Sequence, residues 1–147
     1  VLIDWGATYR GYQSDMTRTF TLGKWPKKIA EIYQIVLDAQ QLAAAALAPG
    51  KSTREIDSIS RNYITKHGYG KEFGHGLGHG LGISKEPPYL HHMHDPMMLQ
   101  PGHITTVEPG IYLPGIGGVR IEDIYVIRDR GAENLCSLPK TLEWSTL

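Results

Sequence analysis

Cysteine is almost absent from this sequence of 147 residues, because Cys136 is the only one. A single thiol cannot form a disulfide within the chain, and it excludes a structural zinc site built from several thiolates. Without a disulfide framework, a reducing cytoplasmic compartment is the default expectation.

Net charge and long apolar runs are also missing. Fifteen Lys and Arg residues balance fifteen Asp and Glu residues, so the bulk charge gives no reason to expect nucleic acid or an anionic membrane as a partner. The longest apolar stretch, residues 42–48, is much shorter than the roughly 20 residues that span a bilayer, and no signal segment opens the chain. We therefore expect small or neutral ligands.

The remaining composition fits one domain over residues 1–147. The apolar share of 41% and the charged share of 20% are typical of an ordinary globular domain. The first residues already have the pattern of a strand interior, so we expect that the N-terminal portion of the domain is absent from this sequence.

Two amphipathic helices are predicted, over residues 26–48 and 52–67. Pro26 suits the first turn of the first helix, which continues with apolar residues at helical spacing until a Pro-Gly pair. Ser52 and Glu55 have the spacing of a capping box at the start of the second helix.

Strands are predicted on both sides of these helices. Residues 70–101 are rich in glycine and proline, so no helix is predicted there and the segment is interpreted as loops. The predicted strands are residues 1–5, 12–22, 104–107, 119–126 and 132–136, the first two as an antiparallel pair. This order of elements predicts an α+β domain.

Five side chains stand in locally ordered motifs and could bind metal: Asp4, Asp15, His79, Glu108 and Glu122. Four converging carboxylates would repel one another strongly unless cations lay between them, and burial adds a cost of several kcal/mol. Two divalent metal ions would supply that charge.

Each acid alone has a structural alternative, because charged residues are mostly solvated or paired. Asp4 could cap a turn at the end of its strand. Asp15 could pair with Arg18. Glu122 could pair with Arg120 or Lys140.

The motifs around the five residues resemble the pita-bread metallopeptidases, the family of methionine aminopeptidase, Xaa-Pro aminopeptidase and prolidase. They keep the order and spacing of the family, including eleven positions from Asp4 to Asp15, and they cover almost the whole chain. Trp5-Gly6-Ala7 and the segment 119–123 are most similar to the Xaa-Pro aminopeptidase and Xaa-Pro dipeptidase (prolidase) branch. The resemblance implies a pita-bread fold, in which helices flank a curved antiparallel sheet.

The resemblance also implies a dinuclear site in which Asp15 and Glu122 bridge two ions, Asp4 holds one, and His79 and Glu108 hold the other. Oxygen-rich ligation with one imidazole suits Mn²⁺, Co²⁺, Fe²⁺ or Zn²⁺, and the family favours Mn²⁺ or Co²⁺. The implied reaction is hydrolysis of the N-terminal bond of a short peptide, with Pro at the second position, by a metal-bridging hydroxide. Glu108 would carry the proton to the leaving amine.

Two more residues are assigned to the site. His75 matches a family position that contacts substrate, and its structural alternative is to cap the glycine-rich loop. Arg120 lies two positions before Glu122, on the same face of an extended segment, where it would orient or neutralise the acids unless it forms a surface pair. His91, His92 and His94 are interpreted as a surface loop rather than a metal site.

The sequence departs from the family at Glu86, seven positions after His79, where the family carries a histidine. Either that histidine is substituted, or the loop has lost one residue. A second family histidine would precede Asp4, outside this sequence. These departures leave open a non-catalytic peptide-binding module with the same fold, whereas a creatinase-like metal-free hydrolase would have lost the acidic ligands. A homodimer of the full-length protein also stays open.

Overall fold

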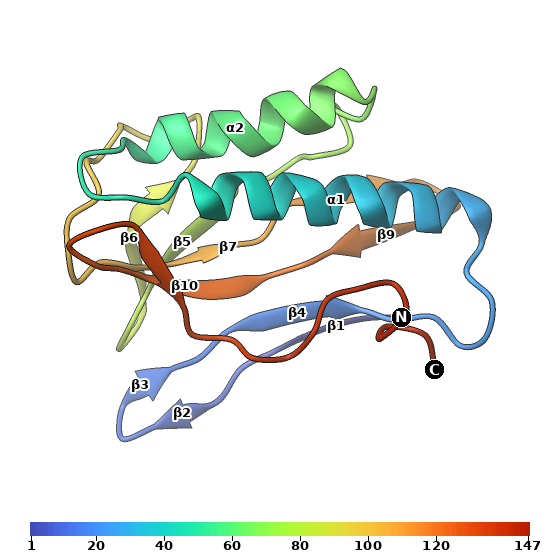
Figure 1. Ribbon diagram of the computed structural model, residues 1–147, viewed down its shortest axis with the longest axis horizontal. Coiled ribbons are helices and arrows are strands. Elements are labelled where there is room, and N and C mark those ends of the chain that lie inside the picture. The colour runs from blue at the N-terminus through green and yellow to red at the C-terminus, as the bar shows by residue number, and fades with distance from the viewer.

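Two helices run side by side over one face of the strands in the computed structural model, which describes residues 1–147 (Figure 1). They are α1 (Lys27–Ala45) and α2 (Thr53–Lys66), close to the predicted bounds. The predicted capping box is confirmed: the Ser52 side chain accepts a hydrogen bond from Glu55 N, and the Glu55 carboxylate accepts one from Ser52 N. No helix has the length and apolarity that crossing a membrane requires.

The largest sheet has five antiparallel strands in the order β11-β10-β7-β5-β6. Their bounds are β5 (Gly78–Leu81), β6 (Lys85–Leu90), β7 (Ile104–Val107), β10 (Asp123–Ile127) and β11 (Ala132–Asn134). The apolar core lies between this sheet and the helices, and includes Ile32, Val36, Ile56, Val107 and Ile121. The predicted α+β class is confirmed.

The other strands form three pairs. The predicted pairing of the first segments is confirmed, because β1 (Leu2–Trp5) is antiparallel to β4 (Met16–Thr19) and places Asp4 opposite Thr17. The hairpin of β2 (Thr8–Tyr9) and β3 (Tyr12–Gln13) extends from this pair (Figure 1). A further hairpin joins β8 (Gly110–Leu113) to β9 (Gly117–Arg120).

Residues 70–101 contain no helix, as predicted, but their interpretation as loops is wrong in part, because β5 and β6 lie there. A Cβ at Gly78 would be 2.0 Å from the Thr106 carbonyl oxygen, and one at Gly80 would be 2.2 Å from the Glu86 carbonyl oxygen. Only glycine permits such close approach of neighbouring backbones, so the glycines that suggested a loop belong to an inner strand.

Candidate metal centre

The five predicted ligands come from separate parts of the chain and lie at the ends or middle of strands. Asp4 is in β1, Asp15 precedes β4, His79 is in β5, Glu108 follows β7, and Glu122 precedes β10. Sheet pairing, rather than sequence proximity, therefore brings them together.

Asp15, His79 and Glu122 form the centre of the cluster, because one ligand atom from each lies within 4.8 Å of the others. His79 Nε2 is 3.6 Å from Asp15 Oδ2 and 3.3 Å from Glu108 Oε1. His79 Nδ1 lies 3.0 Å from the Gly80 carbonyl oxygen, which can only accept a hydrogen bond. Donation from Nδ1 leaves the Nε2 lone pair directed at the carboxylates, as metal binding requires.

Asp4 lies at the rim of this cluster. Its side chain is 45% exposed and forms an ion pair with the Arg120 guanidinium. Arg120 Nε is also 3.8 Å from Glu108 Oε2, so this arginine links Asp4 to the cluster. Four of the five predicted ligands, Asp15, His79, Glu108 and Glu122, therefore lie together in the cluster. The fifth, Asp4, is connected to it through Arg120.

Glu122 is the least satisfied member of the cluster. The residue is 1% exposed, and Oε2 accepts a hydrogen bond of 2.6 Å from the Thr17 hydroxyl. Oε1 is buried and has no hydrogen-bond partner. Burial, followed by the negative charges of Glu108 and Asp15, raises the pKa of Glu122 to about 8.

Glu108 shows the same effect, since burial raises the pKa of its carboxyl group against the opposing influence of His79. A buried acceptor without a partner, close to a second carboxyl group whose pKa is also raised, is the environment in which a cation would be stabilised. The residues present fit a divalent metal ion.

The alternative ion pairs considered for Asp15 and Glu122 are contradicted by the structure. Arg18 binds Asp123 Oδ1 at 2.6 Å, and Lys140 also pairs with Asp123. Glu122 has no ion-pair partner, and Asp15 has Lys85, whose Nζ is 3.1 Å from Oδ2. The acids of the cluster are therefore not explained by the pairs that the sequence suggested.

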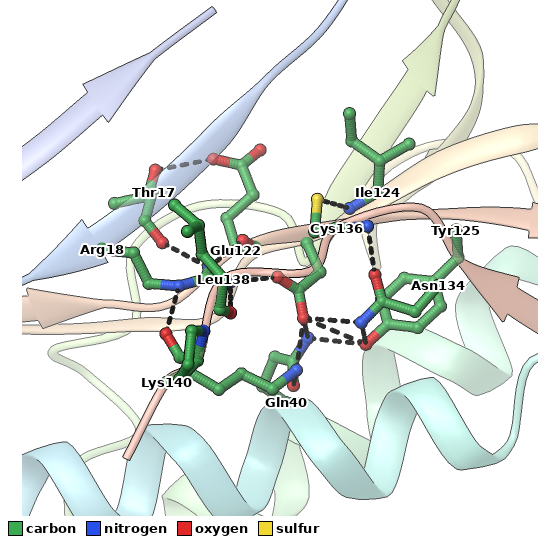
Figure 2. A network of polar contacts seen from close by, with 12 residues as sticks. Thr17, Arg18, Gln40, Glu122, Ile124, Tyr125, Asn134, Cys136, Leu138 and Lys140 are labelled. Carbon is green, nitrogen blue, oxygen red and sulfur yellow. Dashed lines mark hydrogen bonds and ion pairs between the residues drawn. The ribbon is translucent and has the colours of Figure 1, made fainter. Parts of the chain in front are cut away.

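Figure 2 shows the buried polar network that lies behind the cluster. Arg18 is fully buried and donates through Nη1 to the main-chain carbonyl of Glu122 at 2.5 Å, while Thr17 holds the carboxylate of the same residue. Gln40 and Asn134 donate to Asp123 on the far side of the network. The network fixes both ends of Glu122, and sequence analysis missed the role of Arg18 in it.

His75 and Arg120 meet through Tyr112, which sequence analysis also missed. His75 Nδ1 donates to the Gly76 carbonyl oxygen at 2.8 Å, so Nε2 accepts from the Tyr112 hydroxyl at 3.0 Å. Arg120 Nη1 donates to the same hydroxyl at 2.9 Å. Burial is the main effect that lowers the pKa of His75 and favours its neutral form; Arg120 lowers it further, against the opposing hydrogen bond to the Gly76 carbonyl oxygen. The only sequence signal for Tyr112 was its place in the motif that follows Glu108.

A cavity of about 380 Å³ opens beside the cluster, a size that suits a small ligand. Its polar lining includes His75, His79, Lys85, Glu108 and Arg120. Two of the predicted metal ligands, His79 and Glu108, therefore face the same cavity as the predicted substrate-contacting residues His75 and Arg120.

Lys85, rather than Glu86, projects into this cavity. Glu86 lines a different cavity with Pro87, Pro88 and His103. Glu86, seven positions after His79, thus lies outside the cluster, whereas Lys85 contacts Asp15. This placement favours loss of one loop residue over direct substitution of the family histidine.

The histidines after β6 form an aromatic group instead of converging on a metal position. The rings of His91 and His92 stack with centroids 4.8 Å apart, and His94 stacks on Tyr89. His92 Nδ1 is 3.7 Å from Asp57 Oδ2. His91 also lines the cavity of the cluster, so it is closer to the candidate site than a surface loop would place it.

Comparison with known proteins gives a consistent picture. The family model described as metallopeptidase family M24 matches residues 1–129. The chain is 45% identical over 143 residues to an Xaa-Pro dipeptidase of Pyrococcus furiosus, covering 97% of this chain and 41% of that protein.

Two solved structures are also similar to this chain in sequence and in fold. The prolidase from Pyrococcus horikoshii superposes with a TM-score of 0.94 at 45% identity, covering 97% of this chain and 41% of the other. The Xaa-Pro dipeptidase from Bacillus anthracis gives a TM-score of 0.95 at 47% identity, covering 99% and 41%. The predicted pita-bread fold is confirmed, and the chain spans about two fifths of the length of these relatives.

Proposed function

The chain belongs to metallopeptidase family M24, and from this premise we propose that it carries the metal centre of an Xaa-Pro dipeptidase or aminopeptidase. The reaction would be hydrolysis of the N-terminal peptide bond of short peptides with proline at the second position. The observation that supports this most directly is the buried, unpartnered Glu122 Oε1 beside Asp15 and His79.

Two divalent ions would be held by Asp15, His79, Glu108 and Glu122, with Asp4 as the fifth ligand. Mn²⁺ is favoured, and Co²⁺, Zn²⁺ and Fe²⁺ suit the same oxygen-rich set with one imidazole. When bound, the ions would activate a water molecule and stabilise negative charge on the substrate carbonyl oxygen.

Glu108 is the proposed proton carrier. Its Oε1 accepts a hydrogen bond of 2.9 Å from Thr106, which fixes the carboxylate at the edge of the cavity. Burial raises the pKa of Glu108, which makes its carboxylate a better base. The group would accept a proton from the attacking water and return it to the leaving amine.

His75 and Arg120 are proposed to contact the substrate from the cavity wall. The tyrosine hydroxyl between them fixes both side chains, so they present polar groups in a set geometry before substrate binds. A neutral His75 suits contact with a peptide carbonyl or amide, and the fixed charge of Arg120 suits developing negative charge.

The second candidate is a peptide-binding module that keeps the fold without catalysis. The retained cluster of Asp15, His79 and Glu122 weighs against it, and equally against a metal-free hydrolase of the creatinase type. A cytoplasmic location, the absence of nucleic-acid and membrane partners, and a homodimer of the full-length protein stay predictions.

The deciding experiment measures metal content and hydrolysis together. After dialysis against Mn²⁺, mass spectrometry should find about two ions per chain. Asp15→Asn should lose them, while the exposed Glu133→Gln, which removes a carboxylate paired with Arg128, should keep them. Release of proline from Xaa-Pro dipeptides would then establish the peptidase. Bound metal without hydrolysis would favour the binding module, and no bound metal would refute the proposal.

A further inference from the structure

Lys85 places a positive charge at the mouth of the acidic cluster. It is the first residue of β6, and its side chain is 62% exposed although its ammonium lies 3.1 Å from Asp15 Oδ2. It lines the cavity that contains His79 and Glu108, and also the neighbouring cavity beside residues 13–15. Lys85 therefore lines both of the cavities that border the cluster.

Lys85 and Arg120 are the two cations that contact the cluster, and they are held very differently. Arg120 is fixed by the Tyr112 hydroxyl and by the hydroxyl of Thr17, and it pairs with Asp4. Lys85 has Asp15 as its only polar partner. A long flexible side chain with one contact can leave that contact without disturbing anything else.

We infer that Lys85 acts as an internal competitor for the metal, because its ammonium occupies Asp15 in the metal-free chain and must release that carboxylate when an ion binds. The inference rests on the proposed function, since Asp15 is a proposed ligand of both ions. Two consequences follow. Lys85 should stabilise the metal-free cluster by offsetting repulsion among its acids, and it should weaken metal binding.

An ordinary surface ion pair is the competing explanation. A pair with one partner this exposed contributes little to stability, and its loss would leave metal affinity unchanged. The competitor role instead predicts opposite effects of the same substitution on the metal-free and metal-loaded chains. Measuring both states separates the two explanations.

The test replaces Lys85 and measures Mn²⁺ affinity by isothermal titration calorimetry at fixed pH and ionic strength. Lys85→Met removes the charge while keeping an unbranched side chain, and should bind Mn²⁺ about tenfold more tightly than the unmodified chain. Lys85→Arg keeps the charge and should stay near the unmodified value. Lys51→Met is the matched control, because Lys51 is also half-exposed and paired with an acid, Glu55, outside the cluster.

Thermal unfolding supplies the second readout. In EDTA, Lys85→Met should unfold at a lower temperature than the unmodified chain, whereas in saturating Mn²⁺ it should gain more from the metal than the unmodified chain does. Lys51→Met should show neither effect.

The outcomes distinguish this inference from the proposed function. Unchanged or weaker Mn²⁺ binding by Lys85→Met, with normal binding by the unmodified chain, would overturn the competitor role alone. Equal tightening in Lys51→Met would also overturn it, since the effect would then be one of net charge. Failure of every variant to bind Mn²⁺ would overturn both. Binding by Lys85→Met far above that of the unmodified chain would support both.

Discussion

Replacing Arg18 by methionine should destabilise the chain severely, because this arginine is the centre of the buried network behind the proposed metal-binding cluster. Arg18 and Asp123 have side chains that are 0% and 1% exposed, with 2.6 Å between Nη2 and Oδ1. The guanidinium also donates to four main-chain carbonyl groups, those of Thr17, Glu122, Leu138 and Pro139.

The size of the effect follows from what the substitution leaves behind. Removing one partner of a buried ion pair costs about 3–5 kcal/mol, because the other charge stays buried. Asp123 keeps Lys140 and Gln40, which reduces this cost, but the orphaned carbonyl groups add about 1 kcal/mol each where water cannot reach them. We expect a loss of about 4 kcal/mol in the free energy of unfolding, a large part of the ~5–15 kcal/mol of a typical domain.

Urea denaturation of the metal-free chain measures this loss directly. Arg128→Met is the control, since Arg128 pairs with Glu133 at 2.6 Å but both side chains are more than half exposed, and its effect should stay within about 0.5 kcal/mol. A double-mutant cycle with Asp123→Asn isolates the pair itself. A loss below about 1 kcal/mol for Arg18→Met would refute the reasoning, because it would mean that the buried network is replaceable by apolar packing.

Three further results are expected. In EDTA, the free energy of unfolding should fall by a few kcal/mol from pH 5 to pH 8. The folded chain keeps a proton on Glu122, whose pKa is about 8, whereas the unfolded chain releases that proton near pH 4.5. A free energy of unfolding that stays constant across this range in urea titrations would contradict the prediction. Tyr112→Phe should cost about 1 kcal/mol and lower peptide turnover, because the lost hydroxyl holds His75 and Arg120. Mn²⁺ affinity should stay within about twofold, because the hydroxyl contacts none of the proposed ligands directly and Arg120 keeps its ion pair with Asp4. A calorimetric titration showing lost metal would assign Tyr112 to the metal site. His92→Ala should leave Mn²⁺ content unchanged, because its nearest acid, Asp57, already binds Arg61 twice; metal loss there would reveal a second site.

The helices were predictable because their signals are local. The capping box at Ser52 and the apolar spacing of residues 29–43 each lie within one helix, and they act through neighbours three or four positions apart. The glycines in β5 were misleading, because glycine usually indicates a turn and they suggested a loop. Only the positions of β6 and β7 on both sides show that Gly78 and Gly80 are needed for close backbone approach.

The wrong partner for Asp15 has a geometric reason that the sequence already contained. Asp15 and Arg18 are three positions apart, so along an extended segment their side chains point to opposite faces. Asp15 and Thr17 share a face, and Thr17 does reach the cluster through Glu122. The partner of Arg18 is 105 positions away, at Asp123, and no local pattern could identify it.

The metal-free cluster is tolerated through three separate compensations. Glu122 retains a proton because of its raised pKa, Arg120 neutralises Asp4 at the rim, and Lys85 neutralises Asp15 at the mouth. Ions entering the site would have to displace the proton and Lys85, whereas Arg120 is held in place by Tyr112. Metal binding would therefore be coupled to proton release and to movement of one lysine, and Arg120 would keep a positive charge beside Glu108. The residues that offset repulsion among the acids of the cluster would thus also set how tightly it binds metal ions.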